Sequence, residues 1–140
     1  MIRFVHAAAA VLVILALSAG PVIAQTTKYI PPIKGEAEIQ LLPITAVPDF
    51  KADVVRTTIK LKNNSPTGSI AGLKVVQYWW DKANSPQPVS AVSQRVKKPI
   101  QPGEEVTITL ELPRDPKMFR DSYQFDHANG KIKIKQVKKF

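Results

Sequence analysis

The chain has 140 residues, a formal net charge of +9 and no cysteine, and it carries twelve prolines against six glycines. Removal of a leader leaves about 116 residues, enough for one domain around one core, which excludes most multidomain enzymes but not a small catalyst. Without cysteine, a disulfide framework, thiol catalysis and cysteine-ligated metal sites are excluded.

Met1–Ala24 has the three parts of a secretory signal peptide. Arg3 supplies a positive charge, residues 7–19 form an apolar run, and a Gly-Pro pair then ends any helix ahead of a small-residue cleavage site after Ala24. The alternative is an uncleaved anchor, but the apolar run is shorter than the roughly 20 residues that span a bilayer. We therefore expect a domain exported to the periplasm or the cell exterior, with no transmembrane span in its mature form.

The mature chain is expected to begin with an extended, exposed linker at Gln25–Gly35, which contains a Pro-Pro pair. From residue 36 onward, polar and apolar residues alternate with a period of two, which is typical of half-buried strands. About seven strands are expected, at residues 36–41, 55–62, 73–80, 89–96, 106–112, 123–125 and 131–137.

The connections support an all-β assignment. A short helical turn is expected at Lys117–Asp121, and the last two strands form a hairpin about Asn129-Gly130. In the last strand, Ile132 and Ile134 are expected to face inward. Many short strands without a long helical pattern predict an antiparallel, immunoglobulin-like β-sandwich over residues 36–140.

Four short motifs lie in the middle of the chain: Asn63-Asn64-Ser65 at a strand end, Leu73–Val76, Trp79-Trp80-Asp81, and Ile100–Glu105 before the next strand. With these motifs, Val55–Pro113 resembles the FxLYD family of bacterial immunoglobulin-like domains. Gln77 replaces the first aromatic residue of the motif that names the family. The resemblance implies an exported sandwich module used for interaction or structure, with no common catalytic residues to transfer.

Catalytic and metal-binding patterns are weak. His127 has Asp121 and Asp126 near it in sequence, but a zinc site needs three or four ligands, so we interpret this segment as a polar hairpin loop. Glu104 and Glu105 are neighbours in a turn, where they are expected to be solvated. The sequence has no nucleophile motif and no glycine-rich phosphate loop, and we predict no cofactor and no metal.

The Trp79-Trp80 pair marks a candidate binding surface. Consecutive strand residues point to opposite faces, so one tryptophan is expected to anchor the core while the other lies outside with Tyr78 beside it. Two interpretations remain open for the outer ring. Either a loop covers it, or it forms a platform for a partner strand, peptide or sugar; Tyr78 and Trp80 are the candidates.

The charge distribution marks a second surface. Loss of Arg3 with the leader leaves 19 basic and 11 acidic side chains, a net charge of +8. The last ten residues contain five lysines and no acid: Lys131, Lys133, Lys135, Lys138 and Lys139. These lysines either protect a strand edge and aid solubility or attract an anionic partner, such as lipid headgroups, a polysaccharide or an acidic protein.

The sequence favours an exported, non-enzymatic interaction module of the bacterial envelope. It would bind an anionic or protein partner through the basic last strand and the aromatic residues. Two alternatives are a purely structural or accessory domain and a carboxylate-dependent hydrolase of a cell-wall or sugar polymer, which needs two carboxyl groups in one cleft. Nucleic acid is not an expected partner, because export removes the usual target and no recognition motif is present.

Overall fold

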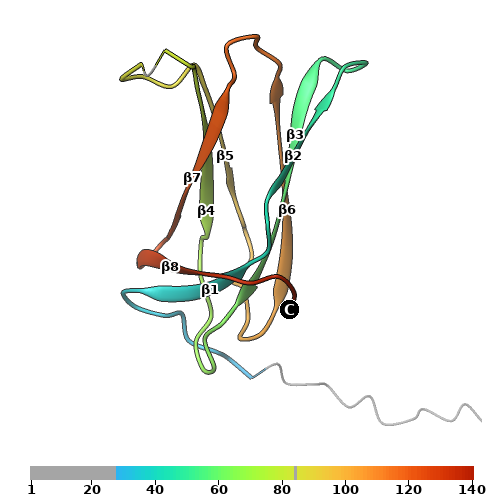
Figure 1. Ribbon diagram of the computed structural model, residues 1–140. Helices are drawn as coiled ribbons and strands as arrows, with labels where there is room; N and C mark the ends of the chain where they lie inside the picture. The colour runs from blue at the N-terminus through green and yellow to red at the C-terminus, as the bar shows by residue number, and fades with distance from the viewer. Residues whose placement is uncertain (1–27, 84) are drawn as a thin grey trace, which may run out of the picture.

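A computed structural model, which describes residues 28–83 and 85–140, is shown in Figure 1. The predicted signal peptide at Met1–Ala24, its cleavage site and the first residues of the predicted linker lie outside the described residues. The described chain is all-β, as predicted, and contains eight strands and no helix. The strands are β1 (Ala37–Leu41), β2 (Thr45–Asp49), β3 (Val54–Asn63), β4 (Lys74–Trp80), β5 (Ser90–Arg95), β6 (Glu105–Pro113), β7 (Arg120–His127) and β8 (Gly130–Gln136).

The strands form one mixed sheet that curls on itself. Its order is β2-β3-β1-β8-β7-β4-β5, and β6 pairs with β3 outside this path. In Figure 1, β4, β5 and β7 stand on one side, β2, β3 and β6 stand on the other, and β1 and β8 cross below them. The structure establishes the all-β class, and the immunoglobulin-like sandwich stays a prediction.

The expectation of a wholly antiparallel sheet is wrong, because β1 and β8 pair in parallel from Ala37↔Ile132 to Leu41↔Gln136. The β7–β8 hairpin forms at the predicted Asn129-Gly130 turn, but these two strands share only two residue pairs. Beyond them β8 leaves β7 and runs beside β1. A parallel pair needs a long connection between its strands, and here the rest of the domain supplies it.

Two local expectations also fail. The strand β2 was not expected, because Pro48 interrupts its apolar pattern; proline is tolerated there since β2 is the last strand in the sheet order. The helical turn expected at Lys117–Asp121 is absent. The Asp115 carboxylate accepts a hydrogen bond from the Lys117 N–H at 2.8 Å, which closes a tight turn, and β7 already begins at Arg120.

The core lies between the two groups of strands and is filled by alternate residues, as the period of two predicts. Ile59 and Leu61 of β3 and Val75 of β4 are fully buried. Ile132 packs against this core, but Ile134 is 39 % exposed, so only one of the two isoleucines expected to face inward is covered. Both isoleucines lie beyond the last β7 residue pair, at Lys131, and pair with β1 instead.

Part of the predicted linker is attached to the domain. Residues 28–35 are extended, but Ile33 packs against the core and its N–H donates to the Ser69 carbonyl at 2.8 Å. The Gly35 N–H donates to the Asn129 carbonyl at 2.9 Å. Gly130 must be glycine at this crossing, because a Cβ atom there would lie 2.3 Å from the Gly35 carbonyl oxygen.

Among residues 28–83 and 85–140, we find no helix with the length and apolar character needed to cross a membrane.

Replacement of the fully buried Leu61 by alanine tests the position of the core. We expect Leu61→Ala to lower the free energy of unfolding by about 2–5 kcal/mol, because it removes apolar contacts and leaves a cavity. Thr107→Ala, on the exposed face of the neighbouring β6, should change it by less than about 0.5 kcal/mol. Urea denaturation of both variants measures the difference, and equal losses would contradict the assignment of this face as core.

Candidate functional site

The seven binding candidates from the sequence occupy two regions of the outer surface. Tyr78 and Trp80 lie on the outer face of β4, opposite the buried Val75 and Gln77. The five lysines follow β8 and the residues after it, and all of them are exposed: Lys131, Lys133, Lys135, Lys138 and Lys139. The structure does not gather the aromatic and basic candidates into one site, because β7 separates β4 from β8.

Tyr78 and Trp80 form an aromatic platform. Their ring centroids are 6.4 Å apart and their planes are tilted by 44°. On the neighbouring β7, Ser122 Oγ accepts a hydrogen bond from the Trp80 indole N–H at 2.9 Å, and Gln124 Oε1 accepts one from the Tyr78 hydroxyl at 3.5 Å. These bonds hold two half-buried rings against the sheet, beside the short side chain of Ala91 on β5. Such a surface offers apolar area and polar edges to a ligand.

Trp79 faces the opposite side of β4, toward the interior of the curled sheet. Both tryptophans are only half-buried, so neither is the fully buried core tryptophan that the sequence suggested. The indole N–H of Trp79 is shielded from solvent and has no hydrogen-bond partner among the described residues. The fully buried polar residue on this face is Gln77, which is 1 % exposed.

Gln77 belongs to a polar network that crosses the core. Its Nε2 donates to Thr57 Oγ1 at 2.8 Å and to the Tyr123 hydroxyl oxygen at 3.0 Å. The Tyr123 hydroxyl in turn donates to the carboxylate of Asp121 at 2.5 Å. Burial raises the pKa of the Tyr123 phenol, and the negative charge and hydrogen bond of Asp121 raise it further. The network gives the buried amide of Gln77 two hydrogen-bond partners.

The last strand brings two of its lysines beside β3. Lys62 in β3 and Lys135 in β8 are both register neighbours of Gln40 in β1. The three side chains share the outer face, so the two lysines flank Gln40 with their Cα atoms about 10 Å apart. Lys62 also lies near the C-terminal ring, with its Nζ 5.9 Å from the centroid of Phe140.

A second pair of lysines completes this surface. The Leu42 N–H donates to the Lys60 carbonyl at 3.1 Å, and the Val137 N–H donates to the Leu41 carbonyl at 3.0 Å, so the chain after β8 stays beside β1. As a result Lys60 and Lys138 line one hollow of about 290 Å³ with two threonine hydroxyls. We name Lys60, Lys62, Lys135 and Lys138 the basic cluster.

Sequence reasoning missed the two β3 members of this cluster. The alternation in β3 placed Lys60 and Lys62 on the outer face, but no local pattern showed that β8 would lie so close to them. Lys133, by contrast, forms an ion pair with Glu38 at 3.7 Å, which neutralises part of the predicted basic strand. Lys131 is a register neighbour of Asp126.

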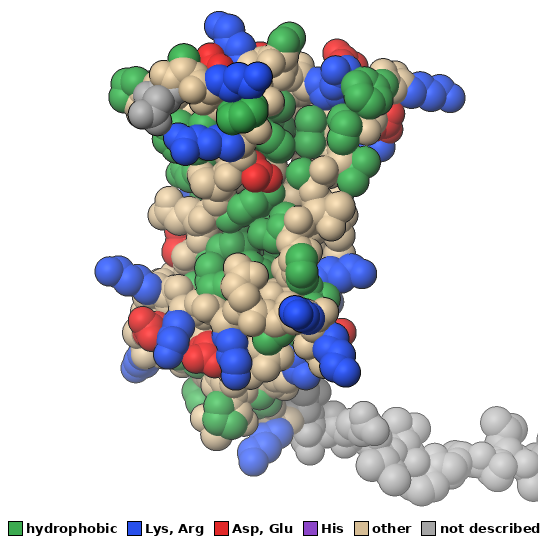
Figure 2. Space-filling view, viewed as in Figure 1, with side chains coloured by type: hydrophobic (Ala, Val, Ile, Leu, Met, Phe, Trp, Pro, Cys, Tyr) green, Lys and Arg blue, Asp and Glu red, His purple; other side chains and the backbone are tan. Residues whose placement is uncertain are grey.

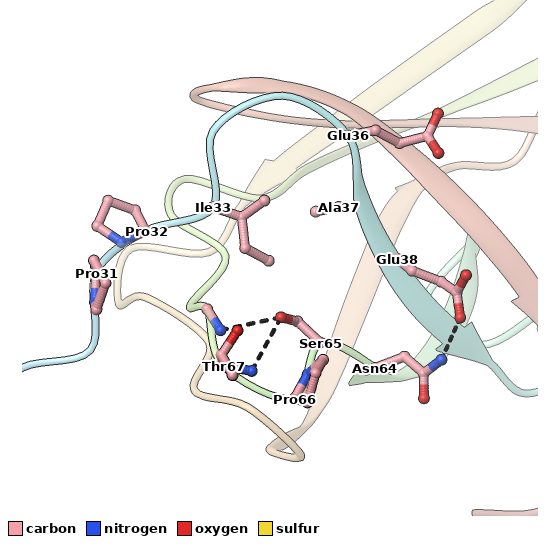
Figure 3. A pocket seen from close by; sticks show the side chains of 11 residues that line it. Pro31, Pro32, Ile33, Glu36, Ala37, Glu38, Asn64, Ser65, Pro66 and Thr67 are labelled. Carbon is pink, nitrogen blue, oxygen red and sulfur yellow. Dashed lines mark hydrogen bonds between the residues drawn. The ribbon is translucent and has the colours of Figure 1, made fainter.

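A hollow of about 610 Å³ lies between residues 31–33, the start of β1 and the 64–68 turn. Figure 3 shows that Glu36 and Glu38 lie close together on one segment of chain, just before β1 and within it, and that Glu38 points toward Asn64, which donates a hydrogen bond to it. Ser65 Oγ accepts hydrogen bonds from the backbone of its own turn. The two carboxylates therefore do not face each other from opposite walls, the arrangement that hydrolysis requires.

The remaining titratable candidates also have structural contacts. The prediction that His127 lies in a polar hairpin loop is wrong. This residue ends β7, is only 5 % exposed, and its Nε2–H donates to the Gly35 carbonyl at 2.7 Å. Glu104 accepts a hydrogen bond from the Gln101 N–H at 2.7 Å, and Glu105 begins β6, both on the exposed surface. Over the described ranges, no three His, Asp or Glu side chains gather in a way that could hold a metal ion.

No protein-family model, no curated protein and no solved structure matches this chain.

The pKa of Tyr123 gives a pH dependence that can be measured. The folded protein keeps this phenol protonated at pH values where the unfolded chain loses the proton. The free energy of unfolding therefore keeps this contribution in full below about pH 10, and it decreases as the pH rises further. Tyr123→Phe should remove this part of the decrease between pH 9 and 11. Urea denaturation at each pH measures it, with Tyr29→Phe, at an 80 % exposed residue, as the control. Parallel curves for wild type and Tyr123→Phe would contradict the prediction.

Proposed function

We propose that this protein is an exported, non-enzymatic binding module that docks an anionic partner on the basic cluster. The observation that carries the proposal is the convergence of four lysines from β3, β8 and the residues after β8 on one outer surface. Within the part of the chain that the structure describes, none of the four forms an ion pair with a carboxylate.

Uncompensated lysines at this spacing repel one another, because they lie within about one Debye length, roughly 8–10 Å. An anion placed between them relieves this repulsion and gains attraction from each ammonium group. The hollow between Lys60 and Lys138 adds the hydroxyls of Thr45 and Thr58, which can donate hydrogen bonds to an anionic oxygen. The ligand chemistry is therefore an anionic oxygen group carried by an acidic protein or polymer.

Export is proposed from the sequence of the first 24 residues, and a non-enzymatic role is proposed because the sequence offers no nucleophile motif or glycine-rich phosphate loop. The resemblance of Val55–Pro113 to exported immunoglobulin-like modules agrees with both. A periplasmic or extracellular module with net charge +8 after cleavage would attract acidic envelope components from a distance. A hydrolase is not favoured, because Glu38 is already bound by Asn64 and Lys133.

A second contact surface is supported by the aromatic platform. Tyr78 and Trp80 are half-buried on a sheet face with short neighbours, and their polar atoms are already hydrogen bonded to β7. A protein partner could therefore pack against the rings without leaving their polar atoms unpaired. If both surfaces contact partners, the module joins an anionic component to an apolar one. If neither does, the accessory-domain alternative holds.

The basic cluster is tested by charge reversal. We expect Lys60→Glu/Lys138→Glu to weaken binding to heparin and to poly-glutamate by tenfold or more at low salt, since each surface lysine contributes on the order of 1 kcal/mol to such attraction. Titration of both polymers at two salt concentrations measures the affinity and its salt dependence.

The matched control changes the net charge by the same amount at another place on the surface. Lys82→Glu/Lys117→Glu alters two exposed lysines in the β4–β5 and β6–β7 connections, away from the basic cluster. We expect this variant to lose much less affinity. Equal losses in the two double variants would show that net charge alone drives binding and would refute a localised site.

The aromatic platform is tested by retention at high salt. Partners captured from an envelope extract of the source organism at 0.5 M salt should be lost with Trp80→Ala, because burial of a tryptophan face does not depend on salt. Val92→Ala, on the opposite face of the adjacent β5, serves as the control for a simple loss of packing. Unchanged capture by Trp80→Ala would remove the platform as a contact surface.

A further inference from the structure

A separate pocket lies at the end of the molecule opposite to β1 and β8, where the β2–β3 and β6–β7 connections meet (upper end of Figure 1). We name this cavity of about 330 Å³ the apical pocket. Most of the residues that line it are of apolar type and come from segments far apart in the sequence: Ala46 and Pro48 in β2, Phe50, Val55 in β3, Trp79 in β4 and Met118. Figure 2 shows hydrophobic side chains on the surface at this end and along the middle of the same face.

One wall of the apical pocket is fixed by a set of polar contacts. The Arg114 N–H donates to the Asp53 carbonyl at 3.0 Å, and the Arg114 guanidinium contacts the Asp53 carboxylate at 3.1 Å. The same guanidinium lies 4.4 Å from the ring centroid of Phe50, which is 72 % exposed. Asp53 has a φ of 57°, in the left-handed region that favours glycine and that aspartate adopts more readily than most other residues. These contacts join the β2–β3 and β6–β7 connections beside the pocket.

The polar lining of the pocket is balanced and favours a neutral occupant. Arg114 and Asp115 are the only charged residues among those that line it, and they have opposite signs. The floor carries the indole of Trp79, whose N–H lacks an acceptor among the described residues. Within the described chain this ring is therefore held by packing contacts and not by a hydrogen bond. A pocket of this volume with aromatic walls fits one large, flat, neutral side chain.

The neighbouring strand edge indicates how such a side chain would be presented. β2 stands at one end of the sheet order and pairs only with β3 within the described chain, so the other edge of β2 is open. An extended polypeptide can add to an open edge through main-chain hydrogen bonds while every second side chain points into the sheet interior. Pro48 has no N–H to offer, so this pairing is confined to the part of β2 before it.

We propose that the apical pocket binds a neutral aromatic side chain of a partner polypeptide that lies in extended form along the open edge of β2. This site is distinct from the basic cluster and from the outer aromatic platform, since it opens on the inner face of β2 and β4. This contact would be insensitive to salt and specific for one type of side chain, and it would act in addition to the binding of an anionic partner by the basic cluster.

The test uses a variant in which Trp79 is the only tryptophan. The chain has two tryptophans, so Trp80→Phe leaves a single indole N–H signal in an NMR spectrum, and it belongs to the pocket. We expect a saturable shift of this signal with the capped peptide acetyl-Thr-Thr-Phe-Thr-Thr-amide. The same peptide with lysine in place of phenylalanine, and N-acetyl-phenylalaninamide alone, should bind at least fivefold more weakly.

Two further substitutions in β2 separate the pocket from the strand edge. Ala46→Phe fills the pocket and should abolish the shift, whereas Val47→Phe, on the opposite face of the strand, should leave it unchanged. Ala46→Leu serves if Ala46→Phe does not fold. The proposal is overturned if no saturable shift occurs or if the lysine peptide binds equally well. Equal binding by N-acetyl-phenylalaninamide alone overturns the extended polypeptide as the occupant.

Discussion

The backbone pairing of β3 is the interaction on which the rest of the structure depends. This ten-residue strand pairs with β6 along nearly its whole length on one edge, and on the other edge it pairs first with β2 and then with β1. Its inward side chains form the centre of the core, and its outward side chains include two lysines of the basic cluster. One strand therefore sets both the interior of the domain and the chemistry of an outer surface.

The parallel pairing of β1 with β8 determines where the C-terminal lysines lie. A hairpin that continued along β7 in the same register would have placed Lys133 and Lys135 opposite Gln124 and Ser122, which are hydrogen bonded to Tyr78 and Trp80. Because β8 leaves β7 after two residue pairs, Lys135 lies across Gln40 from Lys62 instead, and Lys138 reaches Lys60. The change of partner strand from β7 to β1 thus places these lysines away from the aromatic platform.

Local alternation in the sequence was sufficient to predict most strands and the inward residues of β3, because one face of each strand must be buried. It could not predict β2, whose pattern Pro48 interrupts, nor the parallel pairing of β8, which depends on contacts between residues far apart in the chain. The aromatic platform was predictable since adjacent tryptophans must point in opposite directions. The basic cluster and the apical pocket were not, because each joins residues from at least three separate segments.

The β1–β8 pair also has a mechanical consequence. The described chain passes through β1 soon after its start and through β8 shortly before its end, and the two strands are parallel and share five residue pairs. Tension applied through the flanking segments would pull these strands lengthwise in opposite directions, so their hydrogen bonds would be loaded together rather than one after another. Shear of this kind resists force better than the opening of a hairpin, and it would let the domain carry load while its apical loops stay in place.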